Sequence, residues 1–452
     1  MTGLPLIIAF VVAIVAMILL ISKLKVHPFL AIMGISLLLA IVAGIPLTQI
    51  PDVIGAGFSG TFSSIGIVII LGAFIGTVLE KTGAALKLAD MVIRLVGEKN
   101  PQLAIELMGW VVSIPVFCDS GFVILNPIRK ALVKRTRKPS VTMTVCLSCG
   151  LYIAHVFIPP TPGPIAAAQT LGAGEYLLLV IGMGVLCSIF PLIAGLLYAK
   201  FIGKKIKSAD ELTAEGEVVK TYEELKAEYG KLPSGLNALA PLVVPIILMA
   251  ISSIVTMAGW EGPVADFFIF LGTPIMALAV GAVLAIIQLL GAGKKSEFYD
   301  MTNDTLKTVG PILFVTAAGG VLGKVIASSD MVNFITEHAT VLEAMGIFFP
   351  FLLAAILKSA QGSSTVAITT TAGIVAPLLG VLGFTKPVEV ALVVMAIGAG
   401  AMTVSHANDS YFWVVTNFGE MKPEEGYKTQ TLMTLVIGLA AILEIFLLSL
   451  IF

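Results

Sequence analysis

The sequence predicts an all-α polytopic membrane protein made of two inverted-topology repeats of about five transmembrane helices, each repeat with one re-entrant hairpin and one broken helix. The 452-residue chain is 58% hydrophobic and only 12% charged, whereas a soluble protein carries roughly 25% charged residues. Apolar runs recur at the length of about 20 residues that a helix needs to span a bilayer. Lys and Arg are confined to short segments between these runs, and landmarks of the first half recur in the second.

The uninterrupted apolar runs predict ordinary membrane spans. The first run is followed by Lys23 and Lys25 rather than preceded by basic residues, so we expect a first span and not a cleaved signal peptide. In chain order, the expected spans are 4–22, 28–46, 62–80, 175–198, 238–258, 264–290, 309–327 and 430–452.

Two further apolar segments are expected to be re-entrant hairpins. Residues 103–127 lie between two basic stretches, so both ends should be on the same side of the membrane. This segment is interrupted at Pro115 and at Asp119–Gly121. Residues 344–381 form the second expected hairpin, broken at 359–364 and flanked by loops poor in Lys and Arg.

Two more segments are expected to be broken helices. Residues 140–169 are interrupted by the run of prolines at 159–164, and residues 388–418 by the polar run at 405–410. Unwound backbone at membrane depth is tolerated only where it is buried in protein or lines a wet cavity. These interruptions are therefore the expected site of function.

The distribution of basic residues predicts the orientation. Lys and Arg mark cytoplasmic loops, and this places the basic stretches and the hydrophilic linker 200–236 in the cytoplasm, with both termini outside. The linker divides the chain into a first repeat, 1–199, and a second repeat, 237–452. Because five crossings is an odd number, the second repeat would enter the membrane upside down, as in many secondary transporters.

Three landmarks support an internal duplication, although chance similarity among apolar helices is the alternative. Gly72–Gly76 corresponds to Gly319–Gly323 at an offset of 247 residues. Asp119 corresponds to Gln361 at an offset of 242, and Pro160 to His406 at an offset of 246.

The polar residues at the four breaks are the candidate site. Exposed N–H groups at the starts of half-helices attract anions, and buried ionisable groups in a membrane are functional candidates. For proton coupling the candidates are Asp119, His406 and Asp409, because histidine titrates nearest neutral pH. For substrate binding they are Ser120, Asn126, Thr161, Gly163, Lys358, Ser359, Gln361, Gly362, Ser363, Ser364, Thr365 and Asn408.

Several of these roles have alternatives. Lys358 could hold a substrate carboxylate or form an ion pair with Asp119 or Asp409, and both could hold at different stages of the cycle. Thr161 could bind substrate or serve only the conformation of the break. His406 and Asp409 could form a polar pair that braces the unwound helix.

Signatures of enzymes and of metal sites are absent from the sequence. It contains no GxxxxGK[ST] phosphate loop and no HExxH motif. Cys146 and Cys149 form a CxxC inside an apolar run, which favours helix packing over redox or metal chemistry. We therefore expect no enzyme activity, cofactor or metal, and the net charge of −1 gives no indication of a nucleic-acid partner.

Four strings carry a family resemblance: DSGFVIL (119–125), PPTPGP (159–164), AQGSSTVA (360–367) and SHANDSYFW (405–413). With them the chain resembles the gluconate permease family of sugar-acid:proton symporters, within the wider ion-transporter superfamily. The resemblance implies gluconate or a related hydroxylated carboxylate as substrate, a proton as the coupling ion and an inner-membrane location. It also implies a homodimer whose hairpins and broken helices move together as an elevator.

The prediction is therefore a secondary active transporter that imports a sugar acid with protons. The alternatives are a sodium-coupled dicarboxylate or organic-anion symporter and a D-serine or glycerate:proton symporter. A passive anion channel would be a different class, and two occluding hairpins argue against it.

Overall fold

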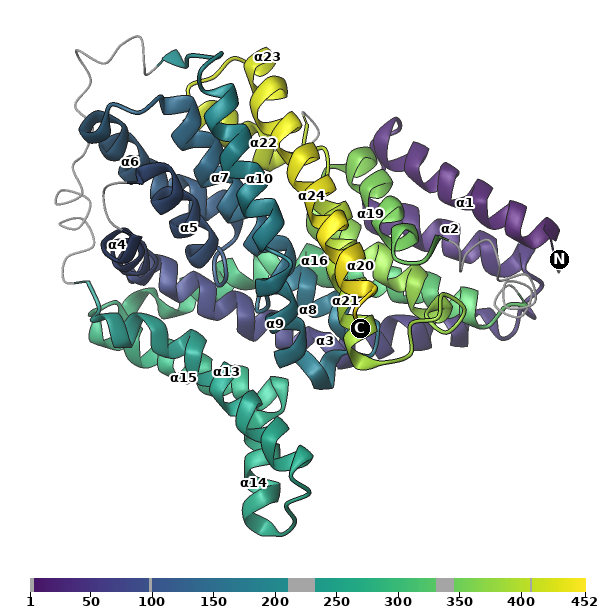
Figure 1. Ribbon diagram of the computed structural model, residues 1–452. Coiled ribbons are helices and arrows are strands. Elements are labelled where there is room, and N and C mark those ends of the chain that lie inside the picture. Colours follow the sequence, from purple (N-terminus) through teal and green to yellow (C-terminus); the bar gives the residue numbers. More distant parts are fainter. Residues whose placement is uncertain (1–3, 97–99, 210–231, 331–344, 407–408) are drawn as a thin grey trace.

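The computed structural model describes residues 4–96, 100–209, 232–330, 345–406 and 409–452, and within these ranges all regular structure is helical (Figure 1). The first-half helices are α1 (Leu4–Ser22), α2 (Pro28–Val42), α3 (Ile50–Lys81), α4 (Ala84–Val96), α5 (Pro101–Val112), α6 (Cys118–Thr136), α7 (Ser140–Phe157), α8 (Pro162–Thr170), η1 (Gly174–Tyr176), α9 (Leu177–Leu186) and α10 (Ile189–Ile202). The second-half helices are α13 (Gly235–Met257), α14 (Pro263–Gly272), α15 (Pro274–Gly291), η2 (Lys295–Glu297), α16 (Phe298–Ala327), α19 (Phe348–Gln361), α20 (Ser364–Val375), η3 (Ala376–Leu378), α21 (Pro387–Met402), α22 (Ser410–Phe418), α23 (Pro423–Gly426), the π-turn η4 (Tyr427–Thr431) and α24 (Leu432–Ser449).

The membrane character of the chain is confirmed by its helices. Six of those described are long and apolar enough to cross a bilayer, and a seventh is added if the bent pair formed by α3 and α4 counts as one span. The helix α3 begins at Ile50, well before the expected span 62–80. The basic stretch after it holds α4, which is bent from α3 by 77° at a turn containing Gly83. Gly83 has φ +74°, a conformation that glycine adopts without a steric penalty.

One expected span is wrong. Residues 264–290 do not form a single helix, because the chain breaks between α14 and α15. Thr273 at the break is extended, with φ −61° and ψ 143°, as expected for a residue that precedes a proline. The arm formed by α13, α14 and α15 reaches away from the other helices at the bottom of Figure 1.

The first hairpin segment is interrupted at Pro115, as expected, but not at Asp119–Gly121. Helices α5 and α6 are separated by Ser113–Phe117, which contains Pro115, whereas Asp119–Gly121 form the first turn of α6. Phe117 is extended (φ −59°, ψ 142°) and precedes the helix. An acidic residue in the first turn is favoured by the helix dipole, so Asp119 starts the helix instead of breaking it.

The other three interruptions lie close to their expected positions. Helix α19 ends at Gln361, where Gly362 adopts the left-handed conformation with φ +89°, and α20 follows. Helices α7 and α8 are separated at 158–161, and α21 and α22 at 403–409. All residues of α7 are buried, as are residues 390–402 of α21, so these two helices form the centre of the protein.

The same packing partners recur in the two halves. In the first half α7 packs against α5, α6 and α10, and in the second half α21 packs against α19, α20 and α24. Glycine allows the closest of these contacts. A Cβ on Gly150 of α7 would lie 1.9 Å from the Glu106 carbonyl oxygen of α5, and one on Gly400 of α21 would lie 2.1 Å from the Phe351 carbonyl oxygen of α19.

Large apolar side chains remain exposed along several helices. Examples are Ile193 and Leu197 of α10, Ile254 of α13, and Leu439 and Leu443 of α24, each more than half exposed. A helix in a bilayer presents such side chains to the lipid tails, which explains the low charge content of the whole chain. Of the linker 200–236, residues 210–231 lie outside the described structure.

Candidate functional site

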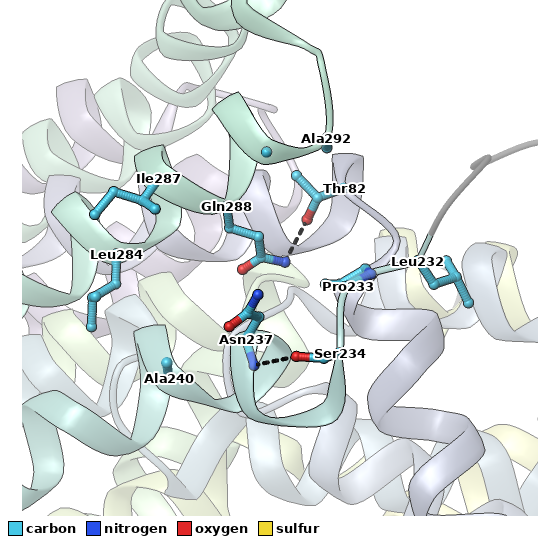
Figure 2. Close-up of a pocket in the computed structure, with 11 residues that line it drawn as sticks. Thr82, Leu232, Pro233, Ser234, Asn237, Ala240, Leu284, Ile287, Gln288 and Ala292 are labelled. Carbon is cyan, nitrogen blue, oxygen red and sulfur yellow. Dashed lines mark hydrogen bonds between the residues drawn. The ribbon is translucent and has the colours of Figure 1, made fainter.

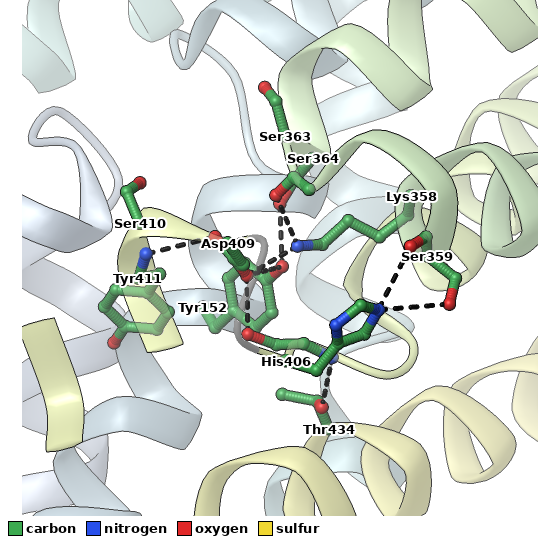
Figure 3. A network of polar contacts seen from close by, with 12 residues as sticks. Tyr152, Lys358, Ser359, Ser363, Ser364, His406, Asp409, Ser410, Tyr411 and Thr434 are labelled. Carbon is green, nitrogen blue, oxygen red and sulfur yellow. Dashed lines mark hydrogen bonds and ion pairs between the residues drawn. The ribbon is translucent and has the colours of Figure 1, made fainter. Parts of the chain in front are cut away.

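A buried ion pair joins the end of α19 to the start of α22. Lys358, in the last turn of α19, is 0% exposed, and its Nζ donates to Asp409 Oδ2 at 2.5 Å (Figure 3). The same Nζ donates to the Gly362 carbonyl oxygen at 2.7 Å. The sequence left open whether Lys358 pairs with Asp119, with Asp409 or with a substrate carboxylate, and in this structure it pairs with Asp409.

Asp409 is held by several donors besides Lys358. As the N-cap residue of α22, it accepts through Oδ1 from the backbone N–H of Tyr411 at 3.0 Å. Ser405 Oγ donates to Oδ2 at 2.5 Å, and Tyr152 OH donates to Oδ2 at 3.5 Å. Both carboxyl oxygens of Asp409 therefore accept hydrogen bonds from the protein, and Oδ2 also pairs with the Lys358 ammonium group.

Tyr152 is a residue of this site that the sequence prediction missed. It belongs to α7 and is fully buried, and its hydroxyl lies 2.7 Å from Ser364 Oγ at the start of α20. It therefore joins α7, in the first half of the chain, to the starts of α20 and α22 in the second half. The available signal was a tyrosine one and a half turns before a break, because a buried tyrosine hydroxyl usually needs a partner.

His406 is half-buried and contacts Ser359, the residue that follows Lys358 in the chain. Its Nε2 is 3.0 Å from the Ser359 carbonyl oxygen and 3.3 Å from Ser359 Oγ. The His406 Nε2 therefore bonds to Ser359 and not to the Asp409 carboxylate. His406 and Asp409 each tie the unwound stretch before α22 to the end of α19.

The first hairpin reaches the site through Asp119. Ser410 Oγ, in the first turn of α22, donates to Asp119 Oδ1 at 3.4 Å. At the opposite end of these helices, Lys130 of α6 forms an ion pair with Glu420, just beyond α22. The half-helices α6 and α22 are thus fastened to each other at both ends.

Asn126 of α6 is also engaged in contacts within the protein. Arg129 is fully buried and donates through Nε to Asn126 Oδ1 at 2.7 Å and through Nη1 to Ser140 Oγ at 2.5 Å. The amide oxygen of Asn126 is therefore engaged in this structure, and a role for Asn126 in substrate binding stays a prediction.

The first broken helix lies against the second hairpin. Thr161 is buried, and its hydroxyl donates to the Ile158 carbonyl oxygen at 2.7 Å. A Cβ on Gly163 would lie 2.9 Å from Ile368 Cδ1 of α20, so this glycine allows α8 and α20 to pack closely.

The remaining predicted site residues vary in position. Ser363 is the N-cap residue of α20, where its hydroxyl accepts from the Val366 N–H at 3.3 Å. Ser120 is half-buried in the first turn of α6, and Thr365 is buried in the first turn of α20. The side chain of Gln361 and all of Asn408 lie outside the described structure.

The geometry favours an anion at this place. Three helix N-termini, those of α6, α20 and α22, are joined by the contacts of Asp119, Ser364 and Asp409. Their N–H groups carry partial positive charge. Lys358 is the buried cation among them, and its partner is at present a carboxylate of the protein. A carboxylate of a ligand has the same chemistry as that partner.

A separate cavity of about 460 Å³ lies away from this network. It lies between the end of α3, the start of α13 and the end of α15 (Figure 2). Gln288 Nε2 donates to Thr82 Oγ1 at 2.9 Å in its wall. None of the predicted site residues lines it, so we do not place the transport site there.

Neither a metal centre nor an enzyme site is apparent. Within the described ranges, no three His, Cys, Asp or Glu side chains are grouped to hold a metal ion. All four cysteines are free and buried. A buried polar cluster at broken helices, inside a protein with a lipid-facing surface, defines a membrane transport protein.

Comparison with known proteins identifies the family. A family model described as GntP family permease matches residues 4–451, and the chain belongs to this family. It is a multi-pass membrane permease and not an enzyme. The predicted resemblance to the gluconate permeases is therefore confirmed.

Individual relatives agree with this membership. The chain is 36% identical to an uncharacterized permease of Haemophilus influenzae, over 92% of this chain and 86% of the relative. It is 29% identical to the low-affinity gluconate transporter of Escherichia coli, over 97% of each. Its fold is similar to that of the Alcanivorax borkumensis YdaH transporter, with a TM-score of 0.63, 16% identity and coverage of 94% and 97%.

Proposed function

We propose that this permease imports gluconate or a closely related sugar acid across the bacterial inner membrane together with a proton. The observation that carries the proposal is the buried ion pair between Lys358 and Asp409, at the point where a hairpin and a broken helix meet. The gluconate transporter among the relatives supports the substrate class.

The ion pair suggests how substrate and proton are coupled. A charge at this depth is costly unless it is paired, so Lys358 needs one carboxylate at every stage. When a proton binds Asp409, that residue becomes neutral and Lys358 is released to bind the substrate carboxylate. Deprotonated Asp409 would compete with the substrate for the same ammonium group. Substrate and proton would therefore bind together.

The hydroxyl groups of the substrate would be bound by the polar residues around this pair. Ser359, Ser363, Ser364, Tyr152 and the N–H groups at the start of α20 are the neighbours available. The hydroxyl of Thr365, the peptide at Gly163 and the side chains of Ser120 and Asn408 stay candidates for the same role. Asp119 and His406 stay candidates for proton coupling.

The wider mechanism is also a proposal. The two repeats would be inverted relative to each other, with the basic loops and the linker 200–236 in the cytoplasm and both termini outside. The hairpins and broken helices would move together past α3 and α16, in an elevator-type cycle within a homodimer. The recurrence of the same helix contacts in both halves supports the duplication.

The test is uptake of labelled gluconate by purified protein in liposomes. A gradient that is alkaline inside should drive accumulation, by about tenfold per pH unit for one proton carried. A sodium gradient at equal pH should not. Uptake that follows sodium and ignores pH would reject the proton, and single-channel currents would indicate a channel.

Two variants divide the candidates for coupling. Asp409→Asn should still exchange internal for external gluconate, but it should lose the proton that Asp409 carries and so lower pH-driven accumulation by about tenfold per pH unit. Asp119→Asn should keep pH-driven accumulation. The reverse result would assign the proton to Asp119 and leave Asp409 with a structural role.

A further inference from the structure

Glu106 is a buried acid that the proposed transport step does not use. It lies in the second turn of α5 and is 0% exposed. Among the residues that the structure describes, neither of its carboxyl oxygens has a hydrogen-bond partner of ordinary geometry, and the donor that faces it is the weakly polar thiol of Cys149. Nearly all buried polar groups in native proteins are satisfied, and an ionisable group inside a membrane protein is a functional candidate.

Of the other buried acidic and basic side chains in the described ranges, His155 also has a ring nitrogen, Nδ1, without a hydrogen-bond partner, whereas the rest are partnered. Lys358 and Asp409 bind each other, Arg129 is held by three groups, and Glu444 accepts from the backbone N–H of Phe190 at 3.0 Å. Among the buried acids of the described ranges, Glu106 is the one whose carboxyl oxygens both lack a hydrogen-bond partner. An unpaired carboxylate in this environment is much more costly than the neutral acid, so this conformation requires a proton on Glu106.

The immediate surroundings of Glu106 are small and weakly polar. Its Oε1 lies 3.2 Å from the point where a Cβ on Gly195 of α10 would stand, and Cys149 Sγ lies 2.1 Å from the same point. The Cys149 thiol has an acceptor of its own, the Pro191 carbonyl oxygen at 4.0 Å. Sodium and other hard cations need several oxygen ligands. This site is therefore suited to a proton and not to a metal ion.

The titratable groups that face Glu106 come from two helices. They are the thiols of Cys146 and Cys149 on α7, and the Lys200 ammonium at the exposed end of α10. Lys200 is the cation that would stabilise the charged carboxylate. Lys200 belongs to α10, so a shift of α10 relative to α5 would bring Lys200 and water to Glu106.

We propose that Glu106 binds a second proton in each transport cycle, so that every sugar-acid anion enters with two protons and one net positive charge. The inference rests on the proposed function. The O–H bond forms when a proton from water binds the carboxylate and breaks when the proton returns to water on the other side. A proton that binds one conformation more tightly than the other is thermodynamically coupled to the change between them.

The test measures the charge carried with each substrate. Proteoliposomes with equal pH on both sides are given a potassium diffusion potential, and accumulation of labelled gluconate is measured. One net charge predicts about a fiftyfold accumulation for 100 mV, inside negative. Glu106→Gln should remove this response to potential, and it should lower pH-driven accumulation from about a hundredfold to about tenfold per pH unit. Exchange of gluconate should persist in this variant.

Glu444→Gln is the matched control, because it changes a buried acid that has a partner, and it should behave like the wild type. A Glu106→Gln variant that responds to potential as the wild type does would overturn the inference. A folded variant that has lost exchange would also overturn it, because Glu106 would then serve packing.

The wild type decides the question even if the variant does not fold. Accumulation that responds to pH but not to potential would reject the second proton and leave the proposed function standing. Accumulation that ignores pH would reject the proposed function itself.

Discussion

The ion pair between Lys358 and Asp409 can be tested by removing each charge alone and then both. Breaking a buried pair on one side costs about 3–5 kcal/mol, because the remaining charge is uncompensated. In Lys358→Gln, Asp409 keeps its hydrogen bonds from Ser405, Tyr411 and Tyr152. We therefore expect the free energy of unfolding to fall by about 3 kcal/mol. In Asp409→Asn, Lys358 keeps only the Gly362 carbonyl oxygen among the partners described, so we expect about 5 kcal/mol.

The double variant Lys358→Gln/Asp409→Asn should lie within about 2 kcal/mol of the wild type, because it leaves no buried charge unpaired. The free energy of unfolding of all four proteins would be measured by denaturant titration in detergent. Of the four proteins, Asp409→Asn should be stabilised most by added gluconate, because the gluconate carboxylate can occupy the position beside Lys358 that the Asp409 carboxylate has left. Additive losses in the double variant, or no stabilisation of Asp409→Asn by gluconate, would refute the reasoning.

Two further variants test individual contacts. Tyr152→Phe removes the hydroxyl between Ser364 and Asp409 and should weaken gluconate binding by about 1 kcal/mol, or roughly fivefold, measured by equilibrium binding. Tyr411→Phe, whose hydroxyl donates elsewhere, should bind normally, and equal effects of the two would contradict the assignment. Gly150→Ala should lower the thermal stability and folded yield, because its methyl group would overlap α5, at a cost of about 1–3 kcal/mol or more. Gly182→Ala faces open space and should be neutral.

The overall architecture follows from hydropathy and basic residues because these describe the medium around the helices. The exact helix ends do not follow from these properties, because each end depends on the backbone conformation of one or two residues. The break at Thr273 results from the constraint of a following proline within an otherwise continuous apolar run. Asp119 was expected to interrupt a helix, yet an acid in a first turn stabilises the helix it begins. A polar residue in an apolar segment can either interrupt a helix or begin one, and the conformation of the residues on either side determines which occurs.

The candidate site was accessible to sequence reasoning only in part. Lys358 and Asp409 stand out as charges in apolar runs, but which acid pairs with Lys358 depends on contacts 51 residues apart along the chain. Tyr152 has no charge, and its role arises from the meeting of α7 with two distant segments. Glu106 also lies in an apolar run, but away from any break. Its distinguishing feature, the lack of partners, is visible only once its neighbours are in place.

The glycines of α3 and α16 bear on how the proposed movement could occur. A Cβ on Gly72 of α3 would lie 2.8 Å from the carbonyl oxygen of Pro160, and one on Gly76 would lie 2.0 Å from that of Pro115, so α3 lies directly against the two breaks in the first half of the chain. On α16, a Cβ on Gly323 would lie 2.4 Å from a carbonyl oxygen of α20. Faces made of glycine let backbones approach without interlocking side chains. An interface of that kind resists separation through its close contact, yet opposes sliding less than interdigitated side chains do, and this supports movement of the hairpins along α3 and α16.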